Sequence, residues 1–227
     1  MISIVVPVGP AETDLCSFLS RLQLIPQVGQ VIFVFCPSSE YLSQQLPQDG
    51  RYISITTPAG RGVQLNAGAE AATSDFIWFV HLDSQIANNH WQLLIQSLQR
   101  WPERLHYFDI RFDDDGVGPM WLNTLGANLR SRWLGLPFGD QGFCLSKRTF
   151  IRLQGYPDEA PYGEDHLFIW QAHHAGIKLQ RIAAGLVTSA RKYAGTGWGR
   201  LTLRYQFIWV GQALPQLWRL IKQKVLG

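Results

Sequence analysis

The chain has 227 residues, of which 46% are hydrophobic and 16% are charged, and its formal net charge is +3. This composition excludes intrinsic disorder, which needs low hydrophobicity and a high net charge. The weak positive charge comes without a basic tail or a block of like charges, so nucleic-acid binding is not expected. The three cysteines, Cys16, Cys36 and Cys144, are far apart and form no CxxC motif. We therefore expect neither a disulfide framework nor a structural zinc site, and a reducing compartment is the simplest interpretation.

The N-terminal segment lacks the basic region, longer apolar stretch and cleavage site of a signal peptide. No segment reaches the roughly 20 apolar residues that cross a bilayer. Taken together, these features predict a cytoplasmic protein.

Short apolar runs alternate with helical patterns along the chain. Strands are expected at residues 2–6, 31–35, 52–55, 76–80, 105–112, 139–145, 179–182 and 186–189. Helices are expected at residues 15–22, 63–72, 91–98, 120–134, 163–174 and 201–226, the last broken near Pro215. This alternation is typical of an α/β fold with a mostly parallel central sheet and helices on both faces. No repeat or linker divides the chain, so residues 1–227 are expected to form a single domain.

The first candidate site is the segment His81-Leu82-Asp83, which follows the apolar run 76–80. Ligands of open α/β sheets bind at the carboxyl ends of the strands. If the segment is extended, His81 and Asp83 point to the same side. A carboxylate there suits a hard divalent cation that neutralises a diphosphate. The alternative, that Asp83 caps the next helix, is equally weighted.

Two helix starts are further candidates. Gly60-Arg61-Gly62 precedes a helix that carries Asn66. The backbone N–H groups at the start of a helix, together with one guanidinium, can form an anion-binding site. The alternative is a flexible turn with a solvated arginine. Gly163-Glu164-Asp165 places two acids in the first turn of a helix, where the macrodipole alone accounts for them. The functional alternative is a general base that takes a proton from an attacking hydroxyl.

Other polar residues favour structural interpretations. His173 and His174 fall near a helix C-terminus, where the dipole favours them, and the acidic run 113–115 before Gly116 is more typical of a solvated turn than of a metal site. His166 adjoins the paired acids and is a candidate for lining a site. The aromatic and basic segment from Arg204 onward suits either a membrane surface or packing on the sheet, and packing is slightly favoured.

In this order, the segments resemble a family-2-type glycosyltransferase of the GT-A fold, with its Rossmann-like sheet, and are most similar to a small bacterial subgroup labelled arsenosugar biosynthesis glycosyltransferases. The matching segments are residues 2–7, 60–68, 75–83, 139–143, 155–157, 164–165 and 188–191. The resemblance implies a nucleotide-sugar-binding half at residues 1–112. It also implies an acceptor half at residues 113–227 that ends in an amphipathic tail.

The resemblance also implies roles for individual residues. The nucleotide would be bound by Pro7, Val8, Glu12, Cys36, Arg61, Asn66, His81, Leu82 and Asp83. Asp83 matches the last position of the family's DxD motif and would hold Mg²⁺ or Mn²⁺ against the donor diphosphate. Asp165 would be the base of an inverting transfer, with Glu164 beside it. Gln141 and Arg191 would border the acceptor or the phosphates.

Two departures from the family pattern concern the donor. Cys36-Pro37-Ser38 replaces the acid expected after the second strand, and residues 9–12 replace the usual Asn-Glu pair after the first. Both changes affect contacts to the base and ribose of the donor, so weak base selectivity is expected. The tail lacks the QxxRW pattern of processive synthases, which favours a single transfer over polymerisation.

The implied function is inverting, metal-dependent transfer of a sugar from a nucleotide-sugar donor to the hydroxyl of a lipid-linked or small acceptor. At most peripheral contact with the inner face of the membrane is expected. Two alternatives stay open. A catalytically degenerate nucleotide-sugar-binding protein is supported by Cys36 and the altered loop, whereas the intact Asp83, Glu164 and Asp165 argue against it. A sugar-phosphate nucleotidyltransferase is less favoured, because residues 7–12 supply no glycine-rich arginine loop after the first strand.

Overall fold

The structure, a computed structural model, describes residues 1–25, 28–158 and 163–226. The strands of these residues form a seven-stranded sheet with the order β3-β2-β1-β4-β6-β5-β7. The strands are β1 (Ile2–Val8), β2 (Gln30–Phe35), β3 (Tyr52–Thr56), β4 (Phe76–Phe79), β5 (Leu105–Phe112), β6 (Cys144–Ser146) and β7 (Leu179–Thr188). Every neighbouring pair is parallel except the two that involve β6, which runs antiparallel to β4 and β5.

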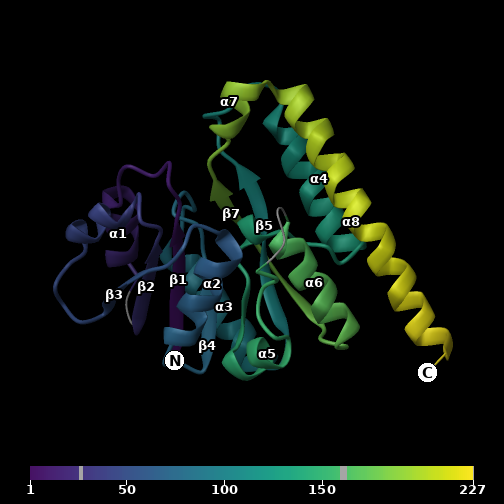
Figure 1. Cartoon of the computed structure of the whole chain (residues 1–227), viewed down its shortest axis with the longest axis horizontal. Helices are drawn as coiled ribbons and strands as arrows, with labels where there is room; N and C mark the ends of the chain where they lie inside the picture. The colour runs from purple at the N-terminus through teal and green to yellow at the C-terminus, as the bar shows by residue number, and fades with distance from the viewer. Residues whose placement is uncertain (26–27, 159–162, 227) are drawn as a thin grey trace.

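Helices cover both faces of this sheet (Figure 1). The helices are α1 (Cys16–Gln23), α2 (Arg61–Ala71), α3 (Asn88–Arg100), α4 (Met120–Trp133), α5 (Lys147–Arg152), α6 (Glu164–His174), α7 (Lys192–Thr196) and α8 (Trp198–Leu226), with 3₁₀ turns η1 (Glu40–Gln45) and η2 (Gly139–Gln141). One hydrophobic core lies between the sheet and α1 and α3, and a second lies under α2, α5 and α6. The predicted α/β class with a mostly parallel sheet is confirmed.

The position of β1 in the middle of the sheet explains why its residues are almost all apolar. Ile4 and Val6 belong to the first core, whereas Val5 between them belongs to the second. A strand covered on both faces needs apolar side chains at its odd-numbered and its even-numbered positions. On the second face Gly68 of α2 lies so close that an added Cβ would overlap Val5 Cγ1. The glycine therefore lets α2 pack directly on the sheet.

The structure differs from three sequence expectations. The two short strands expected after residue 178 are one strand, β7, whose pairing with β5 shifts register between Phe108 and Asp109. The strand expected at 139–145 is limited to β6, because η2 occupies its first residues. The break expected near Pro215 is absent: α8 continues through this exposed proline, although proline donates no N–H to the preceding turn and its ring crowds the carbonyl there.

The carboxyl-terminal elements extend beyond the sheet. Helices α4 and α8 lie side by side, and the end of α8 projects past α6 (Figure 1). They are joined where the Asn123 amide donates to Thr202 Oγ1 at 3.2 Å. Among the described residues, no helix is both long enough and apolar enough to cross a membrane.

Candidate active site

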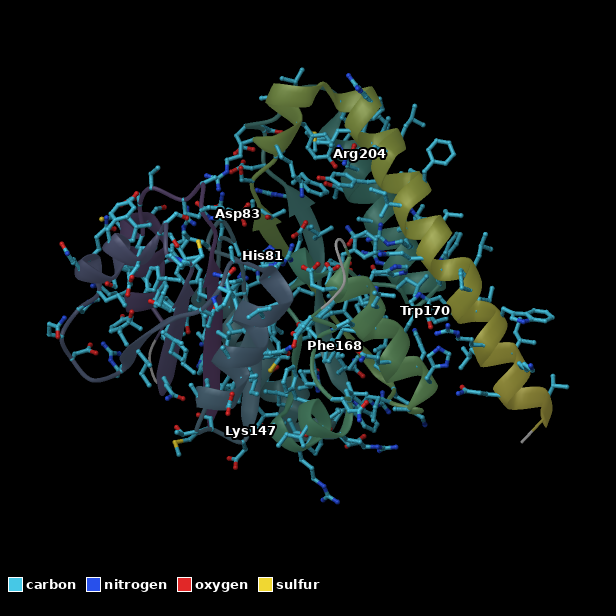
Figure 2. All side chains as sticks on the ribbon, in the orientation of Figure 1. His81, Asp83, Lys147, Phe168, Trp170 and Arg204 are labelled. Carbon is cyan, nitrogen blue, oxygen red and sulfur yellow. The ribbon has the colours of Figure 1, made fainter. Side chains whose placement is uncertain are left out.

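The segment after β4 does not keep the extended alternation that the sequence predicted. β4 ends at Phe79, and the Ser84 N–H donates to the His81 carbonyl at 3.1 Å, which closes a turn. His81 Nδ1 lies 2.9 Å from Asp140 Oδ1, whereas Asp83 Oδ1 accepts a hydrogen bond from Thr188 Oγ1 at 3.3 Å. Both side chains lie near the middle of the molecule, between its two halves (Figure 2). His81 and Asp83 therefore contact different partners and do not face one common position.

Asp83 does not cap the next helix. Helix α3 begins at Asn88, and its N-cap position is Ala87, four residues beyond Asp83. The alternative interpretation of this aspartate is therefore wrong.

Five side chains from separate segments form a charge cluster at the carboxyl end of the sheet: Arg61, His81, Asp140, Glu164 and Lys192. Arg61 Nε lies 3.2 Å from Glu164 Oε1, and Arg61 Nη2 lies 3.7 Å from Asp140 Oδ1. Lys192 Nζ lies 3.5 Å from Asp140 Oδ2, and Arg61 also contacts the His81 ring. Asp140 and Lys192 stand in no local pattern that predicts a site, although Asp140 is part of a segment that carries the family resemblance.

The two acids of the charge cluster have opposite pKa shifts. Burial opposes ionisation of Asp140, but Lys192, His81 and Arg61 outweigh it and hold the pKa of Asp140 well below its usual range. For Glu164, burial and the neighbouring Asp165 carboxylate raise the pKa, and Arg61 only partly offsets them. The cluster therefore holds one firmly ionised carboxylate and one that retains a proton more readily.

Asp165 is held by backbone donors. Helix α6 begins at Glu164, as the sequence predicted, after Gly163 in the left-handed conformation with φ of 72°. Asp165 Oδ2 accepts the Gly139 N–H at 2.6 Å, and its Oδ1 accepts the His166 N–H at 2.8 Å. These contacts tie the first turn of α6 to η2. The carboxylate thereby has a fixed orientation.

A cavity of about 710 Å³ lies between α4, α6, α8 and the end of β5. Its lining includes Arg61, Asp140, Gln141, Glu164 and Asp165, together with aromatic side chains of β5, α7, α8 and the segment between α4 and η2. Both acids of α6 thus line one cavity with the cations of the charge cluster. This cavity is large enough for a small organic ligand.

Arg130 and Gln141 shape one wall of this cavity. Arg130 Cζ lies 3.5 Å from the centre of the Phe138 ring, and burial lowers the pKa of Arg130 to about 10. Gln141 is fully buried, donates to the Phe108 carbonyl at 2.8 Å and accepts the Phe138 N–H at 3.1 Å. Gln141 therefore positions the η2 segment that also holds Asp140.

The predicted nucleotide contacts around β1 and β2 are mostly buried. The Val8 carbonyl accepts from Gln64 Nε2 and from Ser39 Oγ, both at 3.0 Å. Cys36 is fully buried, and its Sγ lies 3.3 Å from the hydroxyls of Ser38 and Ser39. Burial acts to raise the Cys36 pKa, but these hydroxyls outweigh it and lower the pKa. Neither Val8 nor Cys36 lines the cavity described above.

The other predicted site residues lie either between α2 and the segment after α5 or around the loops that follow β1, β4 and β7. Asn66 accepts the Tyr156 N–H at 2.8 Å and donates to the Tyr156 carbonyl at 2.9 Å, which joins α2 to the segment after α5. Glu12 and Arg191 form an ion pair at 2.6 Å between the loops that follow β1 and β7. Pro7 is half-buried on β1, and Leu82 is buried in the turn before Asp83. Asp83 and Arg191 both lie at the end of β7.

A divalent ion would have few protein ligands here. Among the residues that the structure describes, no group of three or more His, Cys, Asp or Glu side chains is arranged to hold a metal ion. Asp83 is half-buried, so its carboxylate can contribute to a shared site. Mg²⁺ commonly takes one or two carboxylates and completes its shell with substrate phosphates and water. The residues therefore fit an ion bound together with a diphosphate, and not a self-contained metal site.

The remaining histidines have structural partners. His173 Nε2 lies 2.8 Å from the Gly135 carbonyl, and His174 contacts Gln216 and Gln223, as expected for residues at a helix end. His106 lies between Ser97 Oγ and the Trp101 carbonyl, and burial lowers its pKa to about 4. His166 lines the cavity next to Asp165, in agreement with the sequence prediction.

Comparison with known families identifies the class of protein. The family described as "Glycosyl transferase family 2" matches residues 37–156, which is more than half of the chain. The chain therefore belongs to glycosyltransferase family 2, and the predicted family resemblance is confirmed. A search of curated proteins finds no match.

Solved structures show the same fold. Residues 1–349 of S. aureus TarS superpose with a TM-score of 0.68 and 14% identity, over 83% of this chain and 60% of that one. TarS in complex with UDP-GlcNAc gives 0.66 and 14%, over 83% and 58%. The mannosyltransferase PcManGT from Pyrobaculum calidifontis, in complex with GDP-Man and Mn²⁺, gives 0.62 and 16%, over 83% and 56%. The likeness confirms the GT-A fold. The chain spans about 60% of the length of these structures.

Proposed function

We propose that this chain transfers a sugar from a nucleotide-sugar donor to an acceptor hydroxyl, with inversion at the sugar and with Asp165 as the general base. The observation that carries the proposal is that Asp165 and Glu164, in the first turn of α6, line one cavity with Arg61 and Asp140. That cavity lies beside the carboxyl end of β4, where ligands of open α/β sheets bind.

Asp165 has the features of a proton acceptor. Each of its oxygens accepts one backbone N–H, which leaves lone pairs free for a further hydrogen bond. The acceptor hydroxyl would give its proton to this carboxylate while its oxygen attacks the anomeric carbon. The bond from that carbon to the diphosphate then breaks, and the diphosphate leaves with the electron pair. Attack opposite the leaving group inverts the sugar, and no enzyme nucleophile is needed.

Cations and one carboxylate support departure of the diphosphate. Arg61 and Lys192 would stabilise its negative charge, since guanidinium and ammonium groups bind phosphate oxygens. Asp83 would hold Mg²⁺ or Mn²⁺, which supplies further charge stabilisation of the leaving group. The neighbour PcManGT was solved with GDP-Man and Mn²⁺, and TarS with UDP-GlcNAc, which supports this class of donor. Arg191 and Glu12 would border the same region.

The other finer assignments are proposals of the same kind. Residues 1–227 would act as one catalytic domain, with the donor bound by the first half and the acceptor by the second. A single transfer, a cytoplasmic location and the narrower bacterial subgroup stay predictions from the sequence. Asn66 and Gln141 would act by positioning, because both hold backbone segments.

A donor screen tests the proposal. The purified chain would be incubated with UDP- and GDP-sugars and Mn²⁺, and release of nucleoside diphosphate would be measured beside binding by calorimetry. We expect at least one donor to bind and to be hydrolysed slowly, with water in place of the acceptor, and hydrolysis to fall in Asp165→Asn. Binding of a donor without turnover, with every acceptor class tried, would instead establish the degenerate binding protein. Absence of binding to every donor would overturn the proposal.

A further inference from the structure

Helix α8 carries an apolar stripe on the side that faces away from the rest of the protein. The stripe, called the outer stripe here, consists of Leu203, Phe207, Val210, Leu214, Leu217, Trp218, Ile221 and Val225. Spacings of three, four and seven residues place them within about 100° of one another around the helix. All are exposed, including Phe207 at 77% and Trp218 at 69%. An exposed stripe of this length differs from the scattered apolar residues of ordinary surfaces.

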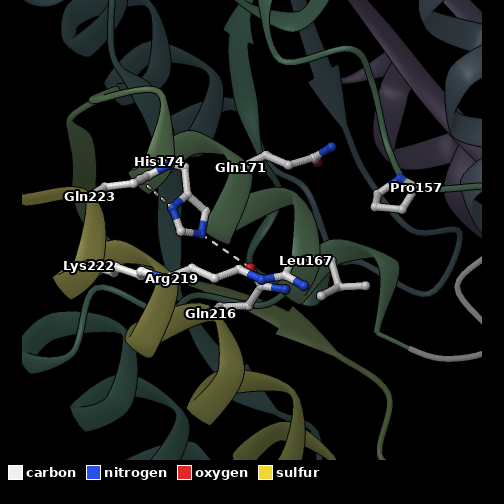
Figure 3. A pocket seen from close by; sticks show the side chains of 8 residues that line it. All are labelled: Pro157, Leu167, Gln171, His174, Gln216, Arg219, Lys222 and Gln223. Atoms are coloured by element: carbon white, nitrogen blue, oxygen red, sulfur yellow. Dashed lines mark hydrogen bonds between the residues drawn. The ribbon is translucent and has the colours of Figure 1, made fainter. Parts of the chain in front are cut away.

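The side of α8 that faces the body is mostly polar in its second half, although Leu220 packs against the second core. A hollow of about 810 Å³ between α6 and α8 is lined there by Gln216, Arg219, Lys222 and Gln223 (Figure 3). Gln216 and Gln223 contact His174 of α6. A helix whose only partner is the protein body places its apolar side inward. In the second half of α8 most of the large apolar residues instead face outward, so the protein body leaves the outer stripe uncovered.

The charge around the outer stripe has one sign. From Arg191 to Gly227 the sequence contains no Asp or Glu and seven basic residues, Arg191, Lys192, Arg200, Arg204, Arg219, Lys222 and Lys224. Arg200 and Arg204 are exposed beside the stripe, Lys222 is exposed at the edge of the hollow, and Figure 2 shows Arg204 on α8. The neighbouring helix α4 also lacks acids and exposes Trp121 and Trp133. The surface is thus apolar, aromatic and basic.

We propose that the outer stripe of α8 lies on the surface of a lipid bilayer that contains anionic headgroups. An amphipathic helix with aromatic and aliphatic residues on one side and lysine or arginine beside them binds in the plane of such an interface. Exposed Trp residues favour the headgroup level. The basic residues match the negative potential of anionic lipids, each contributing to attraction that salt screens.

A second copy of the chain is a weaker candidate for the same surface. A symmetric dimer through α8 would bring the same basic surface of both copies together, with no acid on the helix to pair with Arg204 or Lys222. Repulsion between like charges opposes such a contact. An anionic surface has no such penalty, which is why we choose the bilayer.

Vesicle flotation tests the proposal. The full chain would be mixed with phosphatidylcholine vesicles, or with vesicles in which phosphatidylglycerol replaces part of that lipid. The variants are Phe207→Ser/Trp218→Ser and, independently, Leu214→Ser/Ile221→Ser, all at exposed positions. Ile151→Ser is the matched control, because Ile151 is an exposed aliphatic residue on α5 (66%), away from α8. Circular dichroism would verify that each variant folds, and sedimentation velocity would report the oligomeric state.

We expect binding to the anionic vesicles, weaker binding to phosphatidylcholine alone, and a fall of the anionic binding to the phosphatidylcholine level as ionic strength rises from ~0.1 to ~1 M. Each double variant should lower the partition coefficient at least about tenfold, while Ile151→Ser should leave it unchanged. Absence of vesicle binding would overturn the proposal. Equal loss in Ile151→Ser would do the same. If the native chain does not bind vesicles but forms a dimer that the α8 variants dissociate, the outer stripe would instead be the contact with a second copy.

Discussion

Replacement of Asp165 by asparagine separates two roles of this carboxylate. Asp165 accepts the Gly139 N–H at 2.6 Å and the His166 N–H at 2.8 Å. An asparagine has only one oxygen, so its amide nitrogen must face one of these two donors. Leaving one such donor without an acceptor costs about 1–2 kcal/mol. For a chain of this size that corresponds to a fall in melting temperature of about 2–8 °C.

The same change removes the proposed base. Loss of a general base costs at least ~10²-fold in rate, or about 2.7 kcal/mol of transition-state stabilisation. Donor affinity should be nearly unchanged, because the residue acts on the acceptor. Glu164→Gln should have a smaller effect, since the Glu164 pKa is raised by burial and by Asp165, and its Oε1 is engaged by Arg61 Nε at 3.2 Å.

Three measurements together decide between these roles. Steady-state turnover would be compared for the native chain, Asp165→Asn and Glu164→Gln. Calorimetry with UDP or GDP reports donor binding, and thermal unfolding reports stability. Gly68→Ala is the matched control for stability, because Gly68 does not line the cavity and a Cβ there would overlap Val5 Cγ1, which destabilises by about 1–3 kcal/mol. Near-normal turnover in a destabilised Asp165→Asn would show that Asp165 only accepts hydrogen bonds from the backbone and is not the general base. A larger loss in Glu164→Gln would move the base to Glu164.

Three further predictions concern the donor side and pH. Binding of UDP or GDP should depend on Mn²⁺ or Mg²⁺ through Asp83, so equal affinity with and without EDTA, or unchanged metal dependence in Asp83→Ala, would contradict the assignment. Lys192, His81 and Arg61 hold the folded pKa of Asp140 well below its ordinary value of 3.8, so its carboxylate stabilises the fold above about pH 4, and that contribution is lost as pH falls through the folded pKa. Asp140→Asn should therefore cost about 1–3 kcal/mol at neutral pH, and its melting temperature should approach that of the native chain in acid; a constant difference would refute this. Cys36 replaces the expected acid, so nucleoside diphosphates should bind with similar affinity, and a preference of roughly 100-fold would argue against relaxed selectivity.

The sequence by itself determined the features that depend on local pattern. Short, nearly continuous apolar runs such as residues 2–6 favour strands that are covered on both faces, so the class of the sheet follows from the pattern of these runs. Two acids after Gly163 mark the start of α6, because the helix dipole favours negative charge in the first turn. The ordered motifs were sufficient to predict the family that the comparison confirmed.

Tertiary structure decided which of these segments meet. Arg61, Asp140 and Lys192 are separated by 79 and 52 positions in the sequence. Only the strand order brings Arg61 and Lys192 each within 4 Å of Asp140. A turn after β4, closed by Ser84, sends His81 and Asp83 to different partners, which alternation along a strand does not anticipate. The tail is apolar at both inward and outward positions, so the pattern alone leaves its orientation open. Packing of α8 against α6 settles it, because His174 takes the polar side of α8 and leaves the outer stripe exposed.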